Sequence, residues 1–114
     1  MSNWTTICKQ QDLAPNVGCC ALVNQEHVAI FNCKRTQAIY AISNYDPIGK
    51  ASILSRGIIG SIEGEPYVAS PLYKQHFNLQ TGQCLEQPEY QLKTYAVRVV
   101  DNQIQIQAPD SIPT

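Results

Sequence analysis

The sequence predicts an all-β fold, either a small barrel or a sandwich of antiparallel strands. Short apolar runs rich in β-branched and aromatic residues recur along the chain, and clusters of turn-forming residues separate them. No stretch of useful length shows the apolar period of an amphipathic helix. With 114 residues, 44% of them hydrophobic, the chain is long enough for one domain over residues 1–114 with one hydrophobic core rather than two.

The first half of the chain predicts four strands. The first covers residues 5–8, and turn-forming residues at 12–16 end it. Three sequential antiparallel strands follow, separated by polar turns at 24–26 and 34–37: they span residues 18–23, 27–33 and 38–42.

The second half predicts one long loop followed by hairpins. Residues 43–56 contain a proline and a glycine but no regular period, so we expect a loop there. Hairpin strands are then expected at 58–62 with 67–69, at Phe77 with 84–85, and at 94–100 with 103–107.

The last of these hairpins alternates most clearly. Ile104 and Ile106 face one side of it, and the neighbouring glutamines face the other. The tail at 108–114 contains two prolines, so we expect it to lie outside the sheet.

Composition argues against several classes of partner. The formal net charge is −1, so the chain lacks the basic balance that favours binding to nucleic acid or to an anionic membrane. The first residues are polar, which argues against a secretory signal, and the longest apolar runs are too short to span a membrane. We therefore expect a cytoplasmic protein.

Five cysteines raise the question of a metal site or of disulfides. Their spacing contains neither a C-x-x-C nor a C-x-H pair, and their number is odd: they are Cys8, Cys19, Cys20, Cys33 and Cys84. In a reducing compartment we expect free, mostly buried thiols that pack as small hydrophobic side chains. A redox role for the vicinal pair Cys19 and Cys20 is a minor alternative.

Two loops resemble those of a known family. Residues 41–49 read Ala-Ile-Ser-Asn-Tyr-Asp-Pro-Ile-Gly, and residues 70–82 read Ser-Pro-Leu-Tyr-Lys-Gln-His-Phe-Asn-Leu-Gln-Thr-Gly. Together they are similar to the two cluster-binding loops of Rieske proteins. The resemblance spans about residues 5–107, with the loop region at about 44–82, and it implies a Rieske-like antiparallel barrel or sandwich with both loops at one tip.

All four ligand positions of that family are changed. Asp46 and Ser70 stand where the family has cysteines, and Ile48 and Tyr73 stand where it has histidines. A Rieske cluster needs two thiolates and two imidazoles, whereas isoleucine has no donor atom and the other three side chains offer hard oxygens. We therefore expect no 2Fe-2S cluster and no metal on this chain. Asp46 is instead expected to cap its turn through its side chain.

The loops are most similar to one branch of the family, the small subunits of assimilatory NAD(P)H-dependent nitrite reductases. This resemblance implies a large-subunit partner that carries FAD, a 4Fe-4S cluster and sirohaem and reduces nitrite to ammonia in nitrate assimilation. For this chain it implies a non-catalytic interaction module. The tip of the two loops meets the electron partner in cluster-bearing relatives, so Lys50, Arg56, Tyr73 and Lys74 are the expected docking residues; an ordinary solvated loop is the alternative.

The remaining candidate groups favour no catalytic site. The only histidines are His27, expected to be solvated at a hairpin end, and His76, expected to be packed or at the surface; neither belongs to a local signature for nucleophilic catalysis. Glu63 and Glu65 flank a turn glycine and are expected to be exposed. Two alternative functions remain open: a free-standing ferredoxin-type electron carrier with a 2Fe-2S cluster, and a β-barrel binding module of another oxidoreductase.

Overall fold

The computed structural model describes residues 3–23, 25–72 and 74–108. Its elements confirm the predicted all-β class, and within these residues no helix is long and apolar enough to cross a membrane. In chain order the elements are β1 (Asn3–Lys9), the 3-10 turn η1 (Gln10–Asp12), β2 (Gly18–Val23), β3 (Glu26–Cys33), β4 (Ala38–Ser43), β5 (Tyr45–Asp46), β6 (Ala51–Ser52), the 3-10 turn η2 (Leu54–Arg56), β7 (Ile58–Ile62), β8 (Glu65–Ala69), β9 (His76–Asn78), β10 (Thr94–Tyr95), β11 (Val97–Val100) and β12 (Gln103–Ala108).

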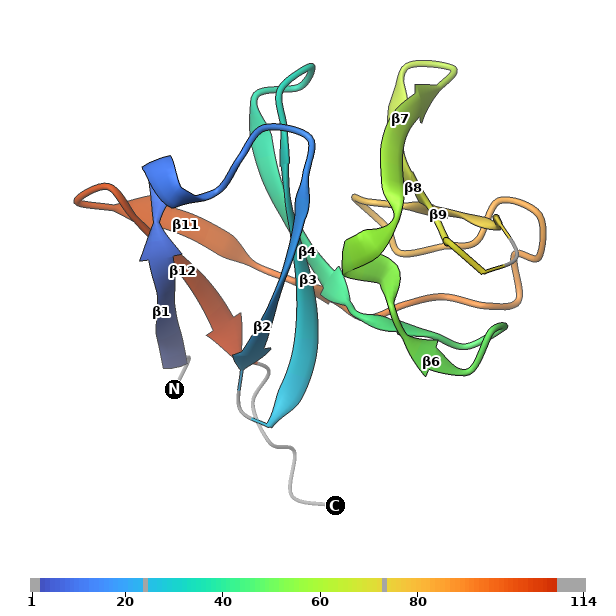
Figure 1. Cartoon of the computed structure of the whole chain (residues 1–114), viewed down its shortest axis with the longest axis horizontal. Coiled ribbons are helices and arrows are strands. Elements are labelled where there is room, and N and C mark those ends of the chain that lie inside the picture. Colours follow the sequence, from blue (N-terminus) through green and yellow to red (C-terminus); the bar gives the residue numbers. More distant parts are fainter. Residues whose placement is uncertain (1–2, 24, 73, 109–114) are drawn as a thin grey trace.

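Three sheets lie side by side and are seen from left to right in Figure 1. The first has the strand order β1-β12-β11, the middle one β10-β4-β3-β2, and the third β7-β8-β9. The short strands β5 and β6 form a hairpin of their own. Every pairing between these strands is antiparallel.

Apolar side chains cover both faces of the middle sheet. Because side chains along a strand alternate between its faces, Val28 and Ile30 of β3 join one cluster, while Ala29 and Phe31 join the other. All four are completely buried. The expectation of a single core is therefore wrong, since the middle sheet is shared by two cores.

We refer to the two clusters as the barrel core and the loop-side core. The barrel core consists of Leu13, Val23, Val28, Ile30, Ala41, Tyr95, Ile104 and Ile106. The loop-side core consists of Ala29, Phe31, Ile42, Leu54, Val68, Phe77, Leu79, Cys84 and Leu92.

The strands predicted in the first half of the chain are confirmed. β2, β3 and β4 pair in that order, and β1 is longer than expected and pairs with β12. The predicted loop at 43–56 is partly wrong, because it contains the hairpin β5–β6 and the turn η2. Pro47 and Gly49 lie in the turn between β5 and β6, so they interrupt the sequence pattern without preventing strand pairing.

The middle hairpins are confirmed with a shorter turn. Glu65 and Pro66, expected in the turn, already belong to β8. Glu63 and Glu65 are both exposed, as expected. Phe77 forms a β-bridge with Cys84, as the sequence predicts.

The C-terminal run predicted as one strand is interrupted at Ala96. Thr94 and Tyr95 pair with β4 of the middle sheet, whereas the residues from Val97 onward pair with β12 of the first sheet. The chain therefore changes sheets at this residue and connects two layers.

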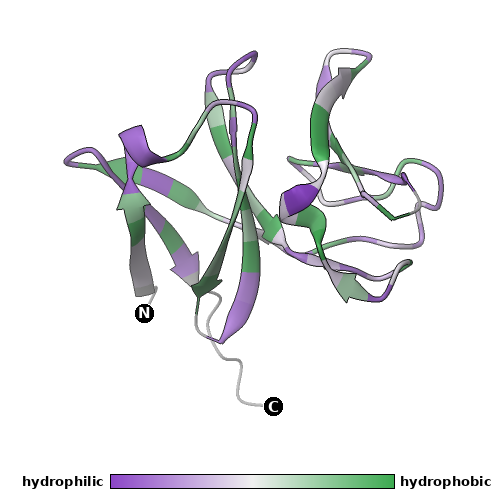
Figure 2. Ribbon diagram, viewed as in Figure 1, coloured by the Kyte–Doolittle hydropathy of each residue, from purple (hydrophilic) through white to green (hydrophobic). Residues whose placement is uncertain are grey.

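Along β12 the predicted alternation is confirmed. Ile104 and Ile106 are completely buried, and Figure 2 shows hydrophobic and hydrophilic bands alternating along the strand. Ala108, expected in the tail, is the last residue of this strand. The rest of the predicted tail, at 109–114, lies outside the described residues.

The five cysteines are free thiols, but only two of them are buried. Cys33 and Cys84 are buried while Cys19 and Cys20 are exposed, so the expectation of mostly buried thiols is wrong. The exposed pair belongs to β2, an edge strand of the middle sheet, where side chains have fewer neighbours. Burial raises the pKa of the Cys84 thiol, which stays protonated at neutral pH.

Candidate functional site

Asn44, a buried residue directly after β4, anchors the first loop. Its backbone N–H donates to the carbonyl of His27 at 2.9 Å, and its carbonyl accepts from the N–H of Leu54 at 3.0 Å. Its side-chain oxygen accepts from the N–H of Ser55 at 2.7 Å, and its side-chain amide donates to the sulfur of Cys20 at 3.4 Å. Asn44 thus ties the start of the loop to the middle sheet and to η2.

Asp46 caps the turn between β5 and β6, which confirms the predicted cap. Its Oδ1 accepts hydrogen bonds from the N–H groups of Ile48 at 2.8 Å and Gly49 at 3.0 Å. Its backbone carbonyl accepts from the N–H of Lys50 at 2.7 Å. The residue is completely buried, and a buried carboxylate needs such donors because its removal from water is costly.

Ser70 closes the second loop on itself. Its N–H donates to the carbonyl of Gln75 at 2.9 Å, and its carbonyl accepts from the N–H of Lys74 at 3.0 Å. Its Oγ accepts a longer hydrogen bond from the N–H of Leu72 at 3.4 Å. Because Ser70 is only 1% exposed, the second loop is folded around a buried hydroxyl group.

One side-chain hydrogen bond joins the two loops. The hydroxyl of Ser70 donates to Oδ2 of Asp46 at 2.5 Å, although the residues are 24 positions apart in the sequence. We refer to this bond as the clasp. Asp46 therefore uses one oxygen for its own loop and the other for the facing loop. A bond of this length between a hydroxyl and a carboxylate is of the strong, charge-assisted kind.

Close packing accompanies the clasp. A Cβ atom at Gly49 would lie 2.7 Å from Cδ1 of Leu72 and 3.0 Å from Oδ2 of Asp46, so a glycine suits this approach of the loops. Ile48, the residue before Gly49, is partly buried and packs against the loop-side core. The position that holds a histidine in Rieske proteins is thus filled by an apolar contact.

These side chains do not match the donor set of a two-iron Rieske cluster, which takes thiolates on one iron and imidazoles on the other. Ile48 has no donor atom, and the side-chain oxygens of Asp46 and Ser70 bond each other and loop N–H groups. Tyr73, the fourth position, lies outside the described residues. In the described part of the chain, no three His, Cys, Asp or Glu side chains are grouped as a metal ion requires.

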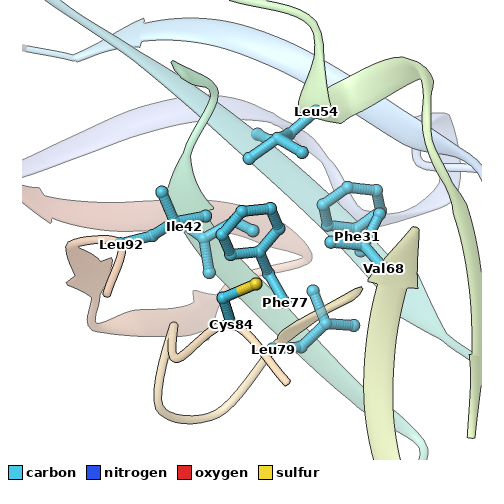
Figure 3. Packing of buried hydrophobic residues seen from close by; sticks show 9 residues of the cluster. Phe31, Ile42, Leu54, Val68, Phe77, Leu79, Cys84 and Leu92 are labelled. Carbon is cyan, nitrogen blue, oxygen red and sulfur yellow. The ribbon is translucent and has the colours of Figure 1, made fainter. Parts of the chain in front are cut away.

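The loop-side core supports the second loop and the turn after β9. Figure 3 shows the ring of Phe77 among the other apolar side chains of this core. Asn78, the next residue, caps the following turn, since its Oδ1 accepts from the N–H groups of Gln80 at 2.7 Å and Thr81 at 3.0 Å. Gly82 ends the turn at a φ of 81°, which favours glycine.

The structure brings together only part of the predicted docking set. Arg56 and Lys74 line the same open depression, which has a volume of about 440 Å³. Lys50 is exposed in the turn between β5 and β6 and does not line that depression. Tyr73 lies outside the described residues.

Neither histidine is placed to activate a nucleophile. The Nδ1 of His76 lies 2.6 Å from Oε2 of Glu86, and the His76 N–H donates to Oε1 of the same carboxylate at 2.8 Å. His27 is exposed, with its Nδ1 4.0 Å from the sulfur of Cys20. Burial and the neighbouring Cys19 raise the pKa of the Cys20 thiol, which is the opposite of what an activated nucleophile needs.

The clasp and the anchoring role of Asn44 are the features that sequence reasoning missed. The two clasp residues do share one signal, because each directly precedes a proline in its loop, as Asp46-Pro47 and Ser70-Pro71. A hydroxyl and a carboxylate can form a hydrogen bond, but only the arrangement of the loops shows that they face each other.

Comparison with known proteins relates both the fold and the loops to one family. The sequence model of the Rieske-like [2Fe-2S] domain matches residues 3–107. The chain is 46% identical over 106 residues to the NADH nitrite reductase small subunit of Escherichia coli K12. This match covers 93% of the chain and 98% of that protein. It is also 32% identical over 101 residues, 89% of this chain, to a segment making up 10% of the NAD(P)H nitrite reductase large subunit of Klebsiella oxytoca.

Solved structures give the same result. The solution structure of the NAD(P)H nitrite reductase small subunit of Erwinia carotovora superposes with a TM-score of 0.81 at 46% sequence identity. The match covers 100% of this chain and 88% of that one. The chain therefore belongs to the Rieske-like family and, within it, to the small subunits of NAD(P)H-dependent nitrite reductase.

Proposed function

We propose that the chain is a non-catalytic, cluster-free module that docks on the large subunit of a cytoplasmic NAD(P)H-dependent nitrite reductase. In this proposal the large subunit carries FAD, a 4Fe-4S cluster and sirohaem, and it reduces nitrite to ammonia in nitrate assimilation. The small subunit acts as one domain that contributes a shaped surface and no catalytic residue.

The clasp is the observation that carries this proposal. In a Rieske domain the cluster connects the two loops through ligands from both of them. Here Ser70 and Asp46 connect them by a hydrogen bond, and Ile48 offers apolar packing where a ligand would stand. This hydrogen bond joins the two loops directly, which supports a role for them as a binding surface.

The relatives support a large-subunit partner. The Escherichia coli small subunit is a chain of its own, whereas a similar segment lies within the large subunit of Klebsiella oxytoca. A module that occurs both as a separate chain and inside the large subunit is expected to contact the rest of that subunit in either arrangement.

Iron content tests the cluster-free state. We expect the chain, purified without oxygen, to be colourless and to contain no more than trace iron. A brown protein with about two irons per chain would contradict the proposal and support a ferredoxin-type electron carrier instead.

Co-expression with the large subunit tests the partner. We expect the two chains to purify together at moderate ionic strength. Nitrite-dependent oxidation of NADH or NADPH, measured with and without the small subunit, then shows whether docking is needed for turnover, with the large subunit alone as the control. Separate elution of two folded chains would contradict docking.

A further inference from the structure

We infer that the depression between η2, β7 and the second loop binds an acidic segment of the large subunit that also presents an apolar side chain. This inference rests on the proposed docking and adds the chemistry of the surface that is docked. We refer to the depression as the basic groove; its lining includes the cations Arg56 and Lys74 and the apolar residues Ile58, Ala69 and Pro71.

The charge of the lining predicts an acidic occupant. Arg56 and Lys74 are exposed, and in the described residues neither forms an ion pair with a carboxylate. Among the described residues, the lining contains no carboxylate of its own. Of the nearby acids, Asp46 bonds Ser70 in the clasp, and Glu86 pairs with His76, which itself lines the groove. Two positive side chains thus share one hollow on a protein whose formal net charge is −1.

The serine in the groove adds no free polar group. The hydroxyl of Ser70 donates to Asp46, and both of its backbone groups bond within the second loop. His76, which also lines the groove, has its Nδ1 paired with Glu86. Recognition of an anionic group is therefore assigned to Arg56 and Lys74. A guanidinium can pair with a carboxylate through two parallel hydrogen bonds, which fixes the orientation of the acid.

An apolar contact is available beside these cations. Ile58 is 79% exposed, the largest value among the exposed large hydrophobic residues of the described chain. A second depression of about 190 Å³ over β7 and β8 shares Ile58, Ala69 and His76 with the basic groove. The surface is therefore continuous along an edge strand and suits an extended protein segment better than a single small anion.

Charge reversal in the groove tests the inference. We expect the double variant R56E with K74E to bind the large subunit about tenfold more weakly at low ionic strength. Its affinity should also respond less to added salt, because fewer opposite charges are left to screen. The matched control is K9E with K34E, which reverses two exposed charges outside the groove and is expected to change the affinity less than about twofold.

The outcomes separate the groove from the docking itself. If the unmodified chain binds the large subunit and the groove variant binds it equally well, the inference about the groove is wrong and the proposed docking stands. If both double variants bind the large subunit equally weakly, the effect comes from overall charge and the inference about the groove is again wrong. No binding by the unmodified chain would overturn both proposals. If the chain self-associates and only the groove variant loses this self-association, the groove binds a second copy of the chain and the inference is wrong.

Circular dichroism of each variant confirms that it is folded.

Discussion

The two faces of the middle sheet are covered in different ways. On one face the barrel core is made of apolar and tyrosine side chains. On the other face, the loop-side core is accompanied by four buried polar residues, Asn44, Asp46, Ser70 and Asn78, all within the loop region. The barrel is therefore held by paired strands and apolar burial, whereas the loops also depend on side-chain hydrogen bonds.

The reason for this difference lies in the backbone. Strands satisfy their N–H and C=O groups by pairing, whereas loop groups need other partners when they are buried. Each of the four buried polar residues accepts at least one backbone N–H through its side chain. In the two loops, polar side chains thus take the place of strand partners for several backbone N–H groups.

The largest expected effect comes from emptying the loop-side core. Phe77→Ala should lower the free energy of unfolding by about 3–5 kcal/mol, since the ring is completely buried. Because β3 and β4 contribute to both cores, we expect a single unfolding transition in urea. Fluorescence of Trp4 in β1 reports on the barrel, and circular dichroism reports on the whole chain.

Ile104→Ala, in the barrel core, is the matched control and should cost about 2–5 kcal/mol. If Phe77→Ala shifted the circular dichroism transition while leaving the Trp4 transition unchanged, the two faces would unfold separately, and the shared middle sheet would not couple them.

The clasp is the next largest expected effect. Asp46→Ala removes the acceptor of three hydrogen bonds and should lower the free energy of unfolding by about 2–4 kcal/mol. Ser70→Ala removes the donor of the clasp and the acceptor of the longer bond from Leu72, and it should cost about 1–3 kcal/mol. In a double-mutant cycle we expect a coupling free energy of about 1–3 kcal/mol between the two.

Glu89→Ala, at an exposed acid, should change stability by less than about 0.5 kcal/mol and serves as the control for loss of a negative charge. Strictly additive effects of the two clasp substitutions, measured by urea unfolding, would show that the interloop hydrogen bond contributes nothing.

A smaller effect is expected where the barrel meets the loop region. A Cβ atom at Gly18 in β2 would overlap the carbonyl oxygen of Ser55 in η2, so Gly18→Ala should lower the free energy of unfolding by about 1–3 kcal/mol. Gly60 in β7 has open space at the same position, and Gly60→Ala should be neutral or stabilise by about 0.4–1 kcal/mol. Equal melting temperatures for the two variants would contradict this close approach.

The smallest effect is a dependence on pH at the edge of the barrel core. The hydroxyl of Tyr95 donates a hydrogen bond to the carboxylate of Glu26 at 2.6 Å, and the ammonium group of Lys93 donates to the same carboxylate at 3.0 Å. These two bonds, that of Tyr95 first, lower the pKa of Glu26. A carboxyl with a lower pKa in the folded protein stabilises the fold above its unfolded pKa of about 4.3 and loses that contribution as the pH falls through its folded pKa. Glu26 is partly exposed, so solvent reduces the effect.

Tyr95→Phe should therefore lower the free energy of unfolding by about 1 kcal/mol at pH 7. The difference in stability between this variant and the unmodified chain should become smaller as the pH falls. Thermal unfolding of both proteins across this pH range measures it. A difference that stayed constant down to about pH 3 would assign the cost of the substitution to packing rather than to the hydrogen bond.

Strands of this fold can be predicted from the sequence because their signals are local. The alternation of Ile104 and Ile106 with glutamine is enough to orient β12. The break at Ala96 could not be predicted in the same way, since β-forming residues continue through it and only the layer arrangement makes the chain change sheets. The exposure of Cys19 and Cys20 depends likewise on β2 being an edge strand, which is a property of the strand order.

In the candidate site, too, local features could be predicted from the sequence and long-range ones could not. The cap made by Asp46 acts over a few residues, and an Asp-Pro turn predicts it. The clasp joins residues 24 positions apart, so its formation depends on how the loops pack around Gly49. Sequence reasoning therefore identified the altered ligand positions but not the bond between two of them.

The clasp has a further consequence for how the subunit is made. An iron–sulfur centre must be built from iron and sulfide by other proteins, and oxidants can dismantle it. The hydroxyl of Ser70 and the carboxylate of Asp46 are present in the chain as it is synthesised, and they bond when the loops fold. In the proposed cluster-free state the tip needs no metal supply, and we expect it to mature equally well under iron starvation.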